Sequence, residues 1–258
     1  MKYLLLAAIT FLSVTFSSAQ KSVLLDTYFN NEYQVDKSTG VKTPFHYRWE
    51  DQTLNGFSIL GDIFKKNGAS LASLPTAPTA ATLKGHQIYI IVDPDTKKES
   101  PNPNLMDDTS VKNIADWVKK GGVLVLFGND SANTNLKSLN KLANVFGINF
   151  NDQMINHVTN DVTREGGGVV TAGTEVFKTS KMVYMKDACS IGLSGKAFPI
   201  LKQKDDVIIG GSTYGKGTIV AIGDPWLYNE YVNGKLQKEF ENDKGADDLV
   251  KWLISKIK

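Results

Sequence analysis

The chain has 258 residues, of which 22% are charged and 10% are aromatic, and its formal net charge is +2. This near balance of charge, and the lack of any basic cluster with interleaved aromatic residues, argue against a nucleic-acid partner. Cys189 is the only cysteine, so an internal disulfide cannot form and the hydrophobic core must stabilise the fold.

The first nineteen residues have the features of a signal peptide. Lys2 supplies a short positive region, residues 3–16 are mostly apolar, and Ser17 and Ala19 are the small residues that precede a cleavage site. The apolar run is shorter than the roughly 20 residues that a membrane helix needs. We therefore predict cleavage before Gln20, export to the periplasm, and no membrane insertion.

Apolar strands alternate with amphipathic helices in the first half of the remaining chain. Strands are predicted at residues 22–27, 87–92 and 123–127, and helices at 56–67, 109–120 and 136–146. This alternation predicts an α/β fold with a mainly parallel, doubly wound sheet that carries helices on both faces, as in flavodoxin-like proteins.

The second half is richer in strands. The predicted elements are strands at 181–185, 198–201, 207–210 and 218–222, a hairpin turn at 214–217 and a closing helix at 246–257. The chain contains no recognisable linker and no internal repeat. We therefore expect residues 20–258 to form a single domain.

Four predicted strands end in polar loops, at residues 26–32, 93–95, 128–130 and 223–231. In open parallel sheets, ligands bind at the carboxyl ends of the strands. We therefore expect these loops to converge on one rim of the sheet and to form a binding site there.

The segment at 123–131 resembles the sharp bend that presents a catalytic nucleophile. Asn129 occupies the bend and cannot act as a nucleophile, and with Asp130 it could equally cap a helix. Cys189 lies far along the chain in an apolar stretch, which favours a place in the core. Covalent catalysis is therefore not predicted.

The sequence predicts no cofactor and no metal centre. His46, His86 and His157 lack the spacing of metal ligands. A loosely held metal ion among Asp26, Glu32 and Asp224 stays an alternative.

Polar and aromatic residues are dense at 26–51 and 223–231, and such a set can hold a sugar by stacking and hydrogen bonds or perform acid–base chemistry. The alternative is that surface loops are polar in any protein.

Several of these segments carry a resemblance to a known family. They are LDTYFNNE at 25–32, FHYRWED at 45–51, GFS at 56–58, IVDPD at 91–95, GGVLVL at 121–126 and GDPWLYNEY at 223–231. The chain resembles a Bacteroidota family of polysaccharide utilisation systems with a class I glutamine-amidotransferase-like fold that lacks the amidotransferase cysteine. Asn129 at the bend agrees with that lack. The chain is also similar to the ulvan oligosaccharide dehydratases of marine flavobacteria.

The resemblance implies a function in polysaccharide breakdown. Members of the family occur alone after a signal peptide or fused to unsaturated uronyl hydrolases. A dehydratase would remove water from the terminal uronate of an oligosaccharide and so supply the hydrolase with its unsaturated substrate. The alternatives are a non-catalytic carbohydrate-binding protein and a structural partner of a sugar-uptake complex.

Dehydration of a terminal glucuronate removes the proton on carbon 5 and the hydroxyl on carbon 4, so it needs a base and an acid. We predict that His46 acts with Tyr28 or Tyr228 in these roles, that Arg48 or an asparagine neutralises the carboxylate, and that Trp226 stacks on a ring. The predicted substrate-binding residues are Asp26, Asn30, Asn31, Glu32, Arg48, Trp49, Asp95, Asn129, Asp224, Trp226 and Glu230.

Overall fold

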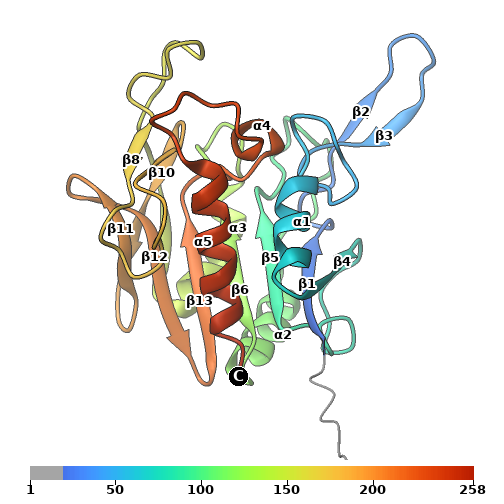
Figure 1. Ribbon diagram of the computed structural model, residues 1–258. Helices are drawn as coiled ribbons and strands as arrows, with labels where there is room; N and C mark the ends of the chain where they lie inside the picture. The colour runs from blue at the N-terminus through green and yellow to red at the C-terminus, as the bar shows by residue number, and fades with distance from the viewer. Residues whose placement is uncertain (1–19) are drawn as a thin grey trace, which may run out of the picture.

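The computed structural model describes residues 20–258, so the predicted signal peptide lies outside the described residues. A seven-stranded sheet in the order β11-β12-β13-β6-β5-β1-β4 forms the centre of the molecule (Figure 1). The strands of this sheet are β1 (Lys21–Asp26), β4 (Ala69–Leu74), β5 (Ile88–Val92), β6 (Val123–Phe127), β11 (Phe198–Gln203), β12 (Asp206–Tyr214) and β13 (Gly217–Ile222).

The sheet is mixed but mainly parallel. Strands β13, β6, β5, β1 and β4 run parallel to one another, whereas β12 is antiparallel to both β13 and β11, and these last two pairings form one edge. The expected α/β class is confirmed, and the strand-rich second half supplies the antiparallel edge. Gly215 has a φ of +60° in the turn between β12 and β13, a conformation that favours glycine and suits the predicted hairpin.

Helices cover both faces of the sheet, and each face has its own hydrophobic cluster. Along β5, Ile88, Ile90 and Val92 join one cluster, whereas Tyr89 and Ile91 join the other, as the two-residue period of a strand requires. One face is covered by α1 (Ser58–Lys66) and α5 (Asn242–Ser255), and the other by α2 (Asp108–Lys119), α3 (Leu136–Ala143) and the short η1 (Asn144–Phe146).

Several strands were not expected from the sequence. Strand β4 has the sequence ASLASL, whose small residues give little strand signal, and it lies at a half-exposed sheet edge. Three further strand pairs lie outside the central sheet. They are β2 (Tyr33–Val35) with β3 (Lys42–Pro44), β7 (Ile148–Ile155) with β10 (Ala188–Leu193), and β8 (Gly168–Val170) with β9 (Met182–Tyr184). Of these six strands, only β9 was predicted, at 181–185.

One end of the sheet is covered by loops and small elements. The β2–β3 hairpin projects at the same end of the molecule as α4 (Asn229–Val232) and β8, opposite to the C-terminus (Figure 1). Within residues 20–258, no helix combines the length and the apolar character that crossing a bilayer requires.

Candidate functional site

The carboxyl ends of four strands form the rim of the candidate site. Strands β1, β5, β6 and β13 are neighbours that run in the same direction, so the loops after Asp26, Val92, Phe127 and Ile222 emerge at one edge of the sheet. The predicted convergence of these loops is therefore confirmed.

Asp93, the first residue after β5, is the centre of a buried hydrogen-bond network. The hydroxyl of Tyr47 donates to Asp93 Oδ2 at 2.6 Å, and the hydroxyl of Thr134 donates to Oδ1. The oxygen of Tyr47 lies 2.5 Å from that of Tyr228, and their rings are stacked with centroids 5.0 Å apart. Tyr228, Tyr47 and Asp93 therefore form a continuous path along which a proton can move.

The network keeps its phenols protonated. Burial raises the pKa of Asp93, although Thr134 and Tyr47 oppose this by hydrogen bonding. Burial, followed by the charge of Asp93, raises the pKa of Tyr47 and of Tyr228 well above the ordinary value. Both phenols are therefore hydrogen-bond donors at neutral pH, and Tyr228 is suited to be an acid rather than a base.

His46 lies beside this network and is held by a carboxylate. Its Nδ1 is 2.9 Å from Glu32 Oε1, and its ring meets the ring of Tyr228 edge-on with centroids 6.3 Å apart. A donor at Nδ1 leaves the lone pair of Nε2 free to accept a proton. The histidine side chain is 25% exposed, so a ligand can reach it.

Backbone strain is concentrated at the same place. His46, Tyr47 and Asp93 have φ values of +59°, +49° and +47°, a region that residues other than glycine rarely occupy. The backbone is held there by hydrogen bonds, because Tyr47 N donates to Asn55 O at 3.0 Å and the Tyr47 hydroxyl is fixed by Asp93. Strain of this kind is typical of functional sites.

A small polar cavity of about 190 Å³ opens beside Tyr228. Asp224, the second residue after β13, lines this cavity and is 4% exposed. Its Oδ2 has no hydrogen-bond partner among residues 20–258. Burial raises the pKa of Asp224 well above its usual range, because a buried carboxylate loses the hydration that stabilises its charge. The other lining residues are Asn129, Asp130, Asn133, Lys186, Asp187, Tyr228 and Tyr231.

The structure therefore brings together His46, Glu32, Asn129, Asp224 and Tyr228 from the predicted set. Tyr28, the other predicted partner of His46, packs edge-on against Phe29 and joins the hydrophobic cluster of the α2 and α3 face. Tyr228 joins the cluster of the opposite face, as does the Tyr47 next to His46. Of the two tyrosines, the structure places Tyr228 beside His46.

Two predicted binding residues are buried structural groups. Asp26 accepts hydrogen bonds from the N–H groups of Tyr28 and Phe29 and from the hydroxyl of Tyr89, so its oxygens are engaged within the protein. Trp226 is fully buried, with its ring 6.2 Å from that of Phe177, and cannot stack on a sugar. For both residues the predicted contact with substrate is wrong, because the side chain has no surface for a ligand.

Other predicted residues support the rim from behind. Asn30 Nδ2 donates to the carbonyl of Asp93 at 2.8 Å, and Arg48 Nη2 lies 3.5 Å from the carbonyl of Asn30. The backbone N–H of Asn31 donates to Asp95 Oδ2 at 3.0 Å. These contacts hold the loops after β1 and β5 together.

Trp49 and Glu230 lie outside the cavity. Trp49 Nε1 donates to the carbonyl of Ala72 at 3.1 Å, and its ring packs against Phe64 of α1. Glu230 lies 3.9 Å from Arg164. Both side chains therefore have contacts within the protein that explain their positions.

The bend after β6 does not cap a helix. Asn135 is the N-cap of α3 and accepts from Ser138 N at 3.1 Å. Asp130 instead accepts from Ala132 N at 2.8 Å within the loop, so the capping alternative for the bend is wrong. Cys189 is buried, and burial raises the pKa of its thiol, as expected for a core residue.

The remaining histidines lie away from this network. His86 Nδ1 lies 2.8 Å from the hydroxyl of Ser22 at the start of β1, and His157 pairs with Asp187 at 2.8 Å. In the part of the chain that the structure describes, no group of three or more histidine, cysteine or acidic side chains is placed to hold a metal ion.

Sequence reasoning missed the centre of the site. Asp93 and Thr134 were not selected, and Tyr47 was not distinguished from its neighbours. The position of Asp93 directly after a fully buried strand was a usable signal. Its contact with Tyr47 joins residues 46 positions apart, which no local pattern reveals.

Comparison with known proteins gives structural neighbours only. No family model and no curated protein matches the chain. The mmIFT52 N-terminal domain matches with a TM-score of 0.67 and 15% identity over 91% of this chain and 98% of that one. The cytoplasmic protein STM1381 from Salmonella typhimurium LT2 gives 0.61 and 15%, over 92% of this chain and 100% of that one.

A third neighbour belongs to a larger protein. Gan42B, a GH42 β-galactosidase from G. stearothermophilus, matches with a TM-score of 0.52 and 14% identity over 92% of this chain but only 30% of that one. At such low identity, these three likenesses show a shared fold and nothing further.

Proposed function

We propose that this chain is an exported, amidotransferase-like domain of a polysaccharide utilisation system that eliminates water from the terminal uronate of ulvan-type oligosaccharides. The observation that carries the proposal is the placement of one proton acceptor, His46 held by Glu32, beside one proton donor, Tyr228, which itself lines a polar cavity. An elimination of water needs these two functions close together.

The roles follow from the geometry. Nε2 of His46 takes the proton from carbon 5, and the hydroxyl of Tyr228 gives a proton to the departing hydroxyl on carbon 4. Both groups leave glucuronate from the same face, so one side of the sugar must meet both residues. The proton that His46 takes up then returns to the Tyr228 oxygen, which restores both residues, and Tyr47 holds that oxygen in place at 2.5 Å.

The substrate carboxylate needs donors because negative charge grows on it during the reaction. The Asn129 amide and the Lys186 ammonium group line the cavity and serve this purpose. The product would pass to an unsaturated uronyl hydrolase. Export to the periplasm by the segment at 1–19 is part of the same proposal.

The test is incubation of the purified protein with oligosaccharides that end in saturated glucuronate. A new double bond conjugated to the carboxylate absorbs in the ultraviolet, and we expect this absorbance to appear. His46→Ala and Tyr228→Phe should each lower its rate by at least about 100-fold. His86→Ala, which alters a histidine that is paired with Ser22 at the start of β1, is the matched control. Full activity in the His46 variant would refute the assignment.

A non-catalytic carbohydrate-binding role is the second candidate. It is supported by the recurrence of the fold within larger sugar-processing proteins, since the chain matches about 30% of the length of a β-galactosidase and 36% of an exo-β-1,4-mannosidase. Binding of the oligosaccharide without any new absorbance, and with the same affinity in His46→Ala, would favour this role over catalysis.

A further inference from the structure

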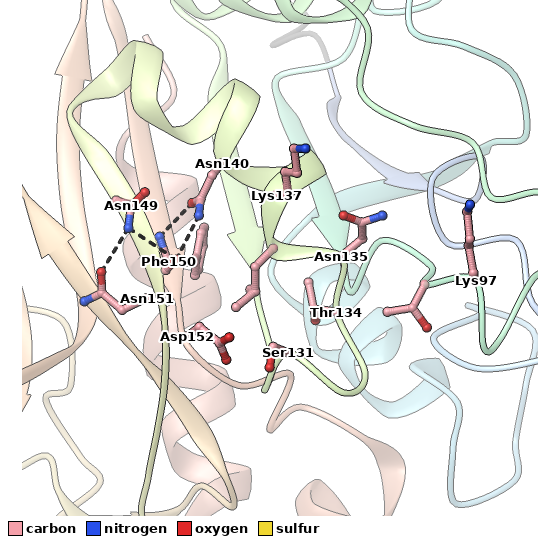
Figure 2. A pocket seen from close by; sticks show the side chains of 12 residues that line it. Lys97, Ser131, Thr134, Asn135, Lys137, Asn140, Asn149, Phe150, Asn151 and Asp152 are labelled. Atoms are coloured by element: carbon pink, nitrogen blue, oxygen red, sulfur yellow. Dashed lines mark hydrogen bonds between the residues drawn. The ribbon is translucent and has the colours of Figure 1, made fainter.

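A second and larger cavity, of about 600 Å³, lies on the other side of the loop that follows β6. One wall is β7, from which Asn149, Asn151 and Asp152 project. The other is the loop before α3 and the first turn of that helix, with Lys137 there and Lys97 farther along the rim (Figure 2). No role has yet been given to these residues.

The loop at 128–135 is a wall shared by the two cavities. Asn129 and Asn133 face the small cavity, whereas Ser131 and Thr134 line the large one. Thr134 also donates its hydroxyl to Asp93 at the centre of the candidate site. A ligand whose end occupies the small cavity therefore has the large cavity directly beyond this loop.

The lining of the large cavity suits hydroxyl groups. Amide side chains both donate and accept hydrogen bonds, as sugar hydroxyls do. The amide of Asn140 is bound to the backbone of Phe150 at 2.7 and 2.8 Å, which ties α3 to β7 and fixes the two walls. Asn149 and Asn151 are linked to each other at 2.9 Å. The Phe150 ring is 1% exposed, so the cavity has no aromatic surface on which a planar base could stack.

The charge of the lining favours an anionic substituent. Lys97 and Lys137 are exposed, and neither forms an ion pair within residues 20–258. Asp152 is the only acidic residue that lines the cavity. A carboxylate or a sulfate ester on the ligand would therefore find two free ammonium groups near a hydroxyl-binding surface.

We propose that the large cavity binds the inner sugar units of an oligosaccharide whose terminal unit occupies the small cavity, and that Lys97 and Lys137 pair with an anionic group on these inner units. This inference rests on the proposed function of the small cavity. It predicts that affinity depends on the length and the charge of the oligosaccharide, because a disaccharide is too short to enter the large cavity fully.

The test measures binding by calorimetry, with a disaccharide and a tetrasaccharide that share the same terminal glucuronate. The tetrasaccharide is used with inner carboxylates, with inner sulfate esters and without charge. We expect charged tetrasaccharides to bind about tenfold tighter than the disaccharide. Lys97→Ala with Lys137→Ala should weaken charged tetrasaccharides by about fivefold to tenfold and leave the disaccharide unchanged. Whether the sulfated or the carboxylated ligand shows the larger loss identifies the group that is bound.

The control pair is Lys119→Ala with Lys120→Ala, which removes the same charge from exposed lysines at the end of α2. Ser131→Trp, at an exposed position that lines the cavity, is a second variant that fills the space without changing charge, and it should also weaken only the tetrasaccharides. Equal affinity for both lengths, or equal effects of the two lysine pairs, would overturn the proposal.

The same measurements distinguish failure of the dehydratase proposal from failure of the inner-sugar site. Length-dependent binding that is lost in the cavity variants, without any ultraviolet absorbance, would keep the inner-sugar site and reject the dehydratase. Turnover at rates that do not depend on length or on Lys97 and Lys137 would keep the dehydratase and reject the inner-sugar site. The absence of binding at both lengths would reject the inner-sugar site.

Discussion

Replacing Tyr47 with phenylalanine tests whether the buried network around Asp93 stabilises the fold. The change removes one oxygen that donates to Asp93 Oδ2 at 2.6 Å and lies 2.5 Å from the Tyr228 oxygen. The ring stays in place, so no large cavity forms. A hydrogen bond to a charged group contributes about 1.5–3 kcal/mol, and an unpaired buried hydroxyl costs about 1 kcal/mol or more. We therefore expect a loss of about 2–4 kcal/mol in the free energy of unfolding.

For a domain of this size, each 1 kcal/mol lowers the melting temperature by about 2–4 °C, so calorimetry should find a decrease of about 5–15 °C. The loss should be greater at pH 8 than at pH 5, because Tyr47 stabilises the ionised form of Asp93 and the unpaired carboxyl can take up a proton in acid. Tyr33→Phe, at an exposed tyrosine of β2, is the control. If both variants melted within 2 °C of the parent, the hydrogen bonds of Tyr47 in the network around Asp93 would not stabilise the fold.

Further predictions concern the rim and the core. Burial raises the pKa of Asp95 from 3.8 to about 7. Between these two pH values the native state holds a proton that the unfolded chain has lost. The stability that comes from protonated Asp95 is therefore fully present below pH 4 and is lost as the pH rises through 7. Asp95→Asn should therefore raise the free energy of unfolding by about 2–4 kcal/mol at pH 8 and by little at pH 4, as measured by urea denaturation. Trp226→Phe should lower stability by about 1–3 kcal/mol and leave oligosaccharide affinity unchanged in calorimetry, whereas a large loss of affinity would restore Trp226 as a binding residue. Gly223→Ala should destabilise by more than about 2 kcal/mol, because its Cβ would overlap the backbone carbonyl of Cys189, and a normal urea midpoint would contradict that.

The central strands predicted from sequence are continuous apolar runs that are buried on both faces of the sheet. Strands β5 and β6 are buried at every position, and such runs are visible in a single sequence. Strand β4 was missed because its small residues pair only at the sheet edge. Strands β7 and β10 pair with each other outside the central sheet. They were missed because β7 is largely exposed and the sequence of β10, ACSIGL, mixes small and polar residues, so neither shows a clear apolar run.

The site was predicted as a region and not as a set of contacts. Polar loops after parallel strands indicated the correct rim, because that follows from topology alone. Trp226 and Tyr228 are only two residues apart, yet the first is sealed in the core and the second lines the cavity. The pairing of Tyr228 with Tyr47 joins positions 181 residues apart. Which of two nearby side chains is buried, and which distant residues pair, depends on tertiary packing, which composition and spacing do not reveal.

The chemistry of the rim follows from which groups can gain a proton and which can lose one. At the bend after β6, where related geometries present a nucleophile, Asn129 can only donate or accept hydrogen bonds. Burial keeps Tyr47 and Tyr228 protonated, so these two neighbouring phenols are donors. His46, whose Nδ1 is held by Glu32, is the proton acceptor that faces them. A site with two buried donors, one acceptor and no nucleophile at its bend is suited to removing and returning protons at a hydroxylated ligand, and water elimination requires those two steps.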